Sequence, residues 1–286
     1  MVRAQAIVLV LIFLSACSNR PRITVGSKNF TEQVLLGEII AQHIEQKMGI
    51  QVDRKLNLAG TLLAHEALKS GSIDLYPEYT GTALTAVLKQ SPMTDAKAVL
   101  ERVRAEYQRQ WNLTWLPPLG FENTFAMVVR KDASVQTLSE AADYAKPWRL
   151  GAGYEFLKRP DGLQGLLRTY PLRLEGSPLA MDLGLLYSAL QSGKVDMAAA
   201  NSTDGLLSVL PVIALADDKT YFPPYECAVI VRDDTLAKHE GLRQTLESLS
   251  GKIDAAMMRK LNHAVDGEHR SVKDVAAEAL RAIGSS

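Results

Sequence analysis

Four polar or aromatic turns carry the residues of this sequence that could do chemistry. They are residues 26–33 (GSKNFTEQ), 76–82 (YPEYTGT), 201–205 (NSTDG) and 221–225 (YFPPY). The first three each join a predicted strand to a predicted helix, and ligands of α/β sheets bind at this end of the strands. Helix N-termini there favour anions such as carboxylates, and aromatic rings favour organic cations. Together the turns predict a site for a small zwitterion.

No catalytic or cofactor motif accompanies these turns. Residues 151–153 (GAG) begin like a dinucleotide-binding fingerprint, but Phe156 stands where the third glycine belongs. His65 and Glu66 lack the second histidine of a zinc-protease motif, and there is no Walker loop or Gly-x-Ser-x-Gly elbow. We therefore predict no cofactor, no metal and no enzymatic activity. The alternative is an exported α/β hydrolase, which requires a nucleophile and a base paired in a cleft.

The composition is that of a folded protein with a balanced surface. The chain has 286 residues and 31.3 kDa, enough for two domains, with 47% hydrophobic and 22% charged residues. Its 32 basic and 32 acidic residues cancel, which argues against nucleic acid as a partner and against a polybasic membrane-binding surface. Two cysteines exclude both a disulfide-built scaffold and a four-cysteine zinc site.

The first 17 residues predict an export signal. Arg3 gives a positive start, and the apolar run of residues 6–14 is too short to span a bilayer of about 30 Å. The alternative is a short buried helix. Residues 14–17 (LSAC) resemble a bacterial lipobox, which implies cleavage and lipidation at Cys17. We expect an exported periplasmic lipoprotein, tethered to the membrane by this N-terminal lipid, with a soluble mature body.

Periodicity predicts strands that alternate with helices in two series. The strands are predicted at residues 23–26, 52–56, 73–76, 121–130, 149–152, 195–198 and 225–231. The helices are predicted at residues 31–48, 61–69, 96–111, 162–169 and 181–191, followed by a helical tail at 236–283. The alternation predicts an α/β protein with largely parallel sheets.

One pattern occurs twice. Residues 68–74 (LKSGSID) resemble residues 190–196 (LQSGKVD), and each reads as a helix end, a glycine C-cap and a strand that begins with an apolar residue and aspartate. A polar turn and another helix follow each copy. The repeat predicts two similar lobes, and the alternative is coincidence, because a helix–glycine–strand junction is common.

The motifs GSKNFTEQ, NLAGT, ALKSGSIDLYPEYTGTAL, EFLKRPDG, STDG and DDKTYFPPYE, in this order, resemble the ProX/OpuAC-like family. Its members are substrate-binding proteins of ABC importers for glycine betaine, choline, carnitine and related quaternary amines. The resemblance implies a two-lobed, type II periplasmic-binding-protein-like fold. The expected lobes are residues 22–124 plus 226–286 and residues 125–225, with hinge crossings near 123–125 and 224–225. The expected partners of this monomer are a small-molecule quaternary amine and the importer's permease subunits.

The resemblance also implies an aromatic cage for the quaternary ammonium group. The residues that match cage positions of the family are Tyr79 in PEYTGT, Phe125 in ENTFA and Tyr225 in FPPYE. Phe125 stands where the family more often has tyrosine. The alternatives are that Tyr79 packs on the core at a helix start and that Tyr225 braces the hinge.

A polar set is implied at the other end of the ligand. Lys28 in GSKNF, Thr82 in YTGT and Arg159 in FLKRPDG match positions that hold the carboxylate. Two alternatives stay open: Lys28 as a solvated loop charge, and Arg159 as the partner of Asp161.

Asn201 departs from the family pattern. The residue before STDG is commonly a cage tyrosine, and its loss weakens a quaternary-ammonium site by about 1–2 kcal/mol. Asparagine adds a donor and an acceptor instead. We therefore place Asn201 in the polar set and predict either low affinity for glycine betaine or a different solute, such as choline, carnitine or ergothioneine.

Overall fold

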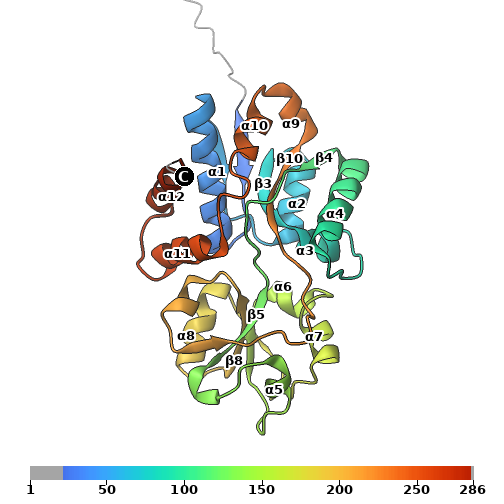
Figure 1. The fold of residues 1–286 in the computed structure, drawn as a ribbon, viewed down its shortest axis with the longest axis vertical. Coiled ribbons are helices and arrows are strands. Elements are labelled where there is room, and N and C mark those ends of the chain that lie inside the picture. The colour runs from blue at the N-terminus through green and yellow to red at the C-terminus, as the bar shows by residue number, and fades with distance from the viewer. Residues whose placement is uncertain (1–21, 285–286) are drawn as a thin grey trace, which may run out of the picture.

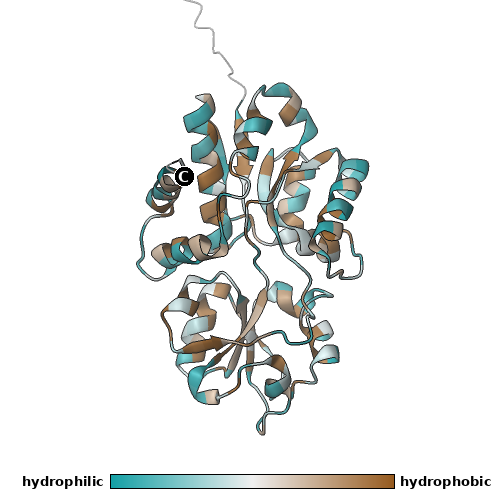
Figure 2. Ribbon diagram, viewed as in Figure 1, coloured by the Kyte–Doolittle hydropathy of each residue, from teal (hydrophilic) through white to brown (hydrophobic). Residues whose placement is uncertain are grey.

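The structure, a computed structural model, describes residues 22–284. The predicted signal segment with Cys17 lies outside these residues. The described chain forms two lobes, one above the other in Figure 1, and each lobe is built around a five-stranded sheet flanked by helices. In Figure 2 the hydrophobic residues gather on the strands and on the helix faces turned toward them, while the outer faces are hydrophilic.

The first lobe holds the sheet with strand order β2-β1-β3-β10-β4. Its strands are β1 (Ile23–Gly26), β2 (Val52–Lys55), β3 (Leu75–Tyr79), β4 (Leu113–Trp115) and β10 (Cys227–Arg232). Its helices are α1 (Thr31–Met48), α2 (Thr61–Lys69), α3 (Thr80–Thr82), the π-helix η1 (Ala83–Val87), α4 (Ala96–Trp111), α9 (Asp233–Lys238), α10 (Leu242–Glu247), α11 (Ala255–Asp266) and α12 (Val272–Gly284).

The second lobe holds the sheet with strand order β7-β6-β8-β5-β9. Its strands are β5 (Phe125–Arg130), β6 (Leu150–Ala152), β7 (Leu179–Ala180), β8 (Met197–Asn201) and β9 (Val212–Ala214). Its helices are η2 (Lys131–Ala133), α5 (Leu138–Ala142), α6 (Tyr154–Lys158), α7 (Leu163–Thr169), η3 (Leu183–Leu185), α8 (Leu186–Gln191) and η4 (Gly205–Ser208).

The sheets are largely parallel, as predicted, because four strands of each sheet run in the same direction, but one strand in each is reversed. β1 and β6 pair in parallel with their neighbours, whereas β10 runs antiparallel to β3 and β4, and β5 runs antiparallel to β8 and β9. The reason is that β5 and β10 each enter a sheet directly from a chain crossing. They therefore start where the parallel strands end.

The internal repeat marks the same place in both lobes. Gly71 and Gly193 have φ angles of 74° and 69°, a left-handed conformation that glycine adopts without strain. The buried residues Ile73 and Val195 follow, and each leads into the central strand of its sheet. The prediction of two similar lobes is confirmed.

Two central strands begin and end later than predicted, and their later ends move two candidate residues out of turns. β3 covers 75–79 instead of 73–76, and β8 covers 197–201 instead of 195–198. Tyr79 and Asn201 are therefore the last residues of strands. Pro77 is tolerated inside β3 because only Leu75 of this strand pairs with β1, so the missing N–H interrupts no ladder on that side.

Other boundaries also differ from the prediction. Residues 121–124 precede β5 rather than belonging to it, and the helix expected at 181–191 is the short η3 followed by α8. The helical tail is interrupted into α9, α10, α11 and α12, and the last three pack on α1 of the first lobe.

The chain passes between the two sheets in residues 116–124 and again in residues 215–226. These crossings lie side by side, because Glu122 and Glu226 form a β-bridge and the Asn123 N–H donates to the Tyr225 carbonyl oxygen at 3.1 Å. Within residues 22–284, no helix is both long and apolar enough to cross a membrane.

Candidate ligand-binding site

The predicted cage residues lie where the strands of both lobes meet the crossings. Tyr79 ends β3, Phe125 begins β5 opposite Asn201 at the end of β8, and Tyr225 lies in the second crossing just before β10. Tyr79 and Tyr225 are buried, while Phe125 and Asn201 are half-buried. The strand ends thus bring residues that are far apart in sequence to the junction of the lobes.

The rings form two groups rather than one. Phe125 and Tyr225 lie with ring centroids 6.0 Å apart, and Phe156 lies 5.0 Å from Phe125. Tyr79 instead stacks near Phe30, with centroids 6.4 Å apart. The sequence reasoning missed Phe30 and Phe156. Phe30 could have been found, because it lies inside the motif that contributed Lys28, whereas Phe156 is reached only through the fold.

Both ring groups face positively charged side chains. The Arg159 guanidinium carbon lies 5.0 Å from the Phe125 centroid and 5.7 Å from the Tyr225 centroid. The Lys28 Nζ atom lies 4.7 Å from the Tyr79 centroid. These distances are within the range of cation–π attraction, so the rings at the junction already interact with cationic side chains of the protein.

Lys28 is buried at the junction, so the alternative of a solvated loop charge is wrong. Only 3% of the residue is exposed. Its Nζ atom forms an ion pair with Glu78 Oε1 at 2.6 Å and lies 3.4 Å from Thr61 Oγ1. Burial of a charge is compensated here by a partner carboxylate and a hydroxyl.

Arg159 pairs with Asp161, the alternative partner considered for it, and it also contacts Thr82 of the first lobe. Its Nε and Nη2 atoms donate to the two carboxylate oxygens of Asp161 at 2.9 and 2.5 Å, and its Nη1 atom donates to Thr82 Oγ1 at 3.0 Å. Burial raises the pKa of Asp161, but the charge and hydrogen bonds of Arg159 outweigh it and hold that pKa below its ordinary value. Two predicted polar residues, Thr82 and Arg159, are thereby joined across the lobes.

Carboxylates of the second lobe also accept hydrogen bonds from the first lobe and from the second crossing. Asp161 Oδ2 accepts hydrogen bonds from Thr85 Oγ1 at 2.8 Å and from Tyr225 Oη at 2.5 Å. Glu155 on α6 accepts from the Thr61 N–H at 2.6 Å and from the Thr61 hydroxyl at 3.1 Å, at the start of α2. Sequence reasoning missed Glu155, because nothing in the sequence shows that α6 meets α2.

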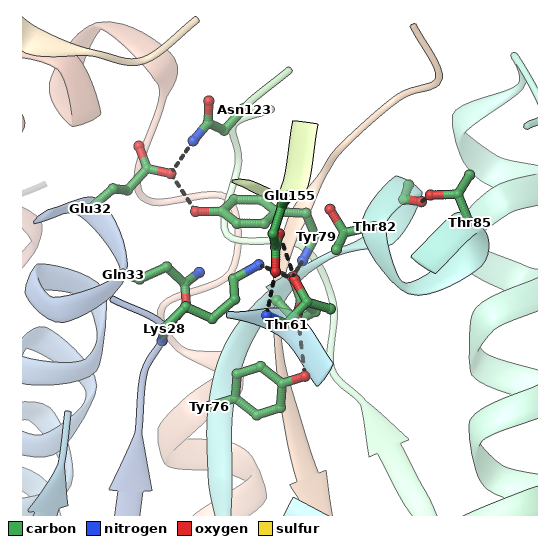
Figure 3. A network of polar contacts seen from close by, with 12 residues as sticks. Lys28, Glu32, Gln33, Thr61, Tyr76, Tyr79, Thr82, Thr85, Asn123 and Glu155 are labelled. Carbon is green, nitrogen blue, oxygen red and sulfur yellow. Dashed lines mark hydrogen bonds and ion pairs between the residues drawn. The ribbon is translucent and has the colours of Figure 1, made fainter. Parts of the chain in front are cut away.

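Glu32 is a buried carboxylate that the sequence analysis also missed. Its Oε1 atom accepts from Tyr79 Oη at 2.6 Å and Asn123 Nδ2 at 2.8 Å, as Figure 3 shows. Its Oε2 atom accepts from Thr203 Oγ1 at 2.5 Å and Asn262 Nδ2 at 3.0 Å. Burial raises the pKa of Glu32, and the hydrogen bonds oppose this rise. The carboxylate links α1 and α11 of the first lobe with the crossing and the second lobe.

Asn201 presents its side chain at the end of β8. Its backbone N–H donates to Asp204 Oδ2 at 3.0 Å, and among the described residues its side-chain amide makes no hydrogen bond. Asp204 also accepts from Tyr187 Oη at 3.0 Å, and burial raises the pKa of Asp204 to about 7. Within residues 22–284, no group of three or more histidine, cysteine, aspartate or glutamate side chains is arranged to hold a metal ion.

Comparison with known proteins shows the family to which this chain is similar. Residues 21–282 match the family model described as the substrate-binding domain of ABC-type glycine betaine transport systems. The carnitine transport binding protein OpuCC of Listeria monocytogenes is 30% identical over 94% of this chain and 92% of its own length.

Two further proteins agree in sequence or in structure. The ergothioneine transport permease/ergothioneine binding protein EgtU of Helicobacter pylori is 33% identical over 96% of this chain and 50% of its own length. A solved structure titled glycine betaine/carnitine/choline ABC transporter has a TM-score of 0.76 and 30% identity, covering 91% of this chain and 97% of that one. With its two-lobed α/β fold, this chain therefore belongs to the family of substrate-binding domains of ABC-type glycine betaine transport systems.

Proposed function

We propose that the protein captures a quaternary-ammonium compound between its lobes and delivers it to the permease subunits of an ABC importer. The cage is Tyr79, Phe125 and Tyr225. The polar set is Lys28, Thr82, Arg159 and Asn201. The observation that carries the proposal is that the faces of these three rings interact with positive charge. The cationic groups of Lys28 and Arg159 lie 4.7 to 5.7 Å from the ring centroids.

The physics of the ligand fits this site. A trimethylammonium group donates no hydrogen bond, so it binds through ring faces and apolar contact, at about 2 kcal/mol for a desolvated contact. A carboxylate at the other end of the ligand requires charged donors, of which Arg159 is the best placed because it already reaches from the second lobe to Thr82.

Glycine betaine is the first ligand to consider, with choline, carnitine and ergothioneine as the alternatives. Carnitine and ergothioneine are the ligands named for the two sequence relatives. The amide of Asn201 favours a ligand that carries a hydrogen-bonding group near its cationic end.

The rest of the account follows from a binding role. The protein catalyses no reaction and requires no cofactor. Residues 22–124 plus 226–286 form the first lobe and residues 125–225 the second, and the mature chain works as a monomer in the periplasm. Lipidation of Cys17 tethers it to the membrane beside its permease.

Isothermal titration calorimetry of the purified mature chain tests the proposal. We expect heat from at least one of glycine betaine, choline, carnitine and ergothioneine. Tyr225→Ala removes one ring and should weaken binding about tenfold or more. Tyr144→Ala is the matched control, because Tyr144 stacks on Trp148 within the second lobe and contacts no cage residue. Absence of heat from all four compounds would contradict the proposal.

A further inference from the structure

The hydroxyl groups of both tyrosines of the proposed cage donate hydrogen bonds to buried carboxylates. Tyr225 Oη donates to Asp161 Oδ2 at 2.5 Å, and Tyr79 Oη donates to Glu32 Oε1 at 2.6 Å. Each hydroxyl is therefore engaged by an acceptor. A phenol that donates to an anion also gains electron density in its ring, which strengthens the attraction between the ring face and a cation.

The two carboxylates differ in how their charge is balanced. Asp161 is paired with the Arg159 guanidinium, whose Nη2 atom lies 2.5 Å from Oδ2. Glu32 receives hydrogen bonds only from neutral groups, and among residues 22–284 it has no lysine, arginine or histidine as an ion-pair partner. Among the described residues, no basic side chain therefore balances its negative charge.

The four neutral donors hold Glu32 in place as an acceptor. Two are hydroxyls and two are amide N–H groups, and an amide nitrogen can only donate. The ionised carboxylate is the form that accepts from all four of them. The donors belong to β3, the first crossing, the second lobe and α11, so the position of the carboxylate is fixed by both lobes.

The other charges near Tyr79 are accounted for. Lys28, whose Nζ atom faces the Tyr79 ring, is neutralised by Glu78 at 2.6 Å. The cationic group of a ligand in the cage would lie near two ion pairs, those of Lys28 and Arg159. It would also lie near the negative charge of Glu32, which no ion pair balances.

We propose that Glu32 supplies the counter-charge for the cationic head group of the ligand, acting through the hydroxyl and ring of Tyr79. Glu32 is a positioning residue that also sets the preference of the cage for a positive charge over a neutral group of the same shape. This inference rests on the proposed function, because it concerns the same site.

Pairs of ligands that differ only in charge test the role. Choline is compared with 3,3-dimethylbutan-1-ol, and glycine betaine with 3,3-dimethylbutanoate, in which carbon replaces the quaternary nitrogen. Two charges on the order of 7 Å apart at an effective dielectric constant of about 20 interact strongly enough to change Kd tenfold or more. In Glu32→Gln we expect Kd for the quaternary amine to rise about tenfold or more and Kd for the neutral-head analogue to rise less than about threefold.

Two further variants separate charge from structure. Glu38→Gln is the matched control: Glu38 is also a buried carboxylate of α1, but it pairs with Arg54 at 2.7 Å and contacts no cage residue. It should change both members of a ligand pair by the same factor. Tyr79→Phe keeps the ring and removes the hydroxyl, and we expect it to lower the cation preference severalfold even if Glu32→Gln fails to fold.

The outcomes distinguish this inference from the proposed function. If the wild-type protein binds none of the quaternary amines, the proposed function is overturned and this role falls with it. If the wild type binds one but Glu32→Gln loses affinity equally for both members of the pair, or Tyr79→Phe leaves their ratio unchanged, the role of Glu32 is overturned and the function stands.

Discussion

Asn201 is the residue at which the proposed site departs most from an all-aromatic cage. It lies opposite Phe125 in the sheet of the second lobe, half-buried at the end of β8. An aromatic ring at this register position would lie beside Phe125 and close a further side of the cage.

We predict that Asn201→Tyr strengthens glycine betaine binding about tenfold, because one additional ring face contributes about 1–2 kcal/mol. Calorimetric titration of the variant and the wild type measures the difference. Asn201→Ala serves as the control that removes the amide without adding a ring. An affinity that does not change in Asn201→Tyr would mean that the missing ring is not what limits binding.

Motifs in the sequence pointed to residues that the fold brings to the junction of the lobes. Lys28, Thr82, Arg159 and Tyr225 all lie at the junction. Glu32 escaped prediction although it lies in the same motif as Lys28, because its role depends on donors 47 to 230 positions away, such as Tyr79 and Asn262. No local pattern records such contacts.

At the scale of elements, α2 carries a histidine that couples the first lobe to pH. His65 is buried against Tyr107 and Trp111, with ring centroids 5.3 and 4.5 Å away. Burial, assisted by the charge of Lys69, lowers the pKa of His65 to about 4. The unfolded chain, with an ordinary histidine pKa near 6.5, therefore binds a proton first as the pH falls.

We predict that His65 makes the protein less stable in acid. Its contribution is complete above pH about 6.5 and is lost progressively as the pH falls toward 4. Between pH 7.5 and 4.5 the wild type should lose about 2 kcal/mol more free energy of unfolding than His65→Phe does. Urea unfolding at the two pH values measures this, and equal losses in the two proteins would refute it.

The elements themselves were predictable to different degrees. The bounds of α1, α2 and α4 agree with the sequence prediction, because local signals such as Gly49 at the end of α1 and the Asp95 cap of α4 define them. The ends of β3 and β8 were not predictable, because antiparallel pairing with β10 and β5 extends both strands to the junction. That extension is what places Tyr79 and Asn201.

At the scale of the whole molecule, the lobes touch closely where η4 meets α11. A Cβ atom on Gly205 would lie 2.2 Å from the backbone nitrogen of His263, so only glycine permits this approach. The contact adjoins the hydrogen bonds to Glu32, because Asn262 precedes His263 on α11 and Thr203 lies two residues before Gly205.

We predict that Gly205→Ala forces the lobes apart and weakens ligand binding about tenfold or more. The reason is that the apparent affinity falls in proportion to the fraction of molecules in the closed, binding-competent arrangement. Small-angle scattering should show a larger radius of gyration for the variant. The control is Gly184→Ala, where a Cβ atom meets nothing within 4 Å. Equal radii and equal affinities for Gly205→Ala and the wild type would count against this account of closure.

The two-lobed architecture was readable from the repeat around Gly71 and Gly193, but the arrangement of the lobes was not. Contacts such as Glu155 with Thr61 and Arg159 with Thr82 join segments 77 to 94 residues apart. They arise only after both sheets have formed. The sequence therefore offers candidates for the ligand site, but it does not predict which residues bring the lobes together.

The central claim is that rings at the junction of the lobes hold a quaternary ammonium group. A crystal structure of the protein with its best-binding quaternary amine tests it most directly. The account predicts the quaternary nitrogen within about 6 Å of the ring centroids of Phe125 and Tyr225, with a face of Tyr79 also in contact. A nitrogen bound away from these rings, or a ligand outside the junction, would contradict it.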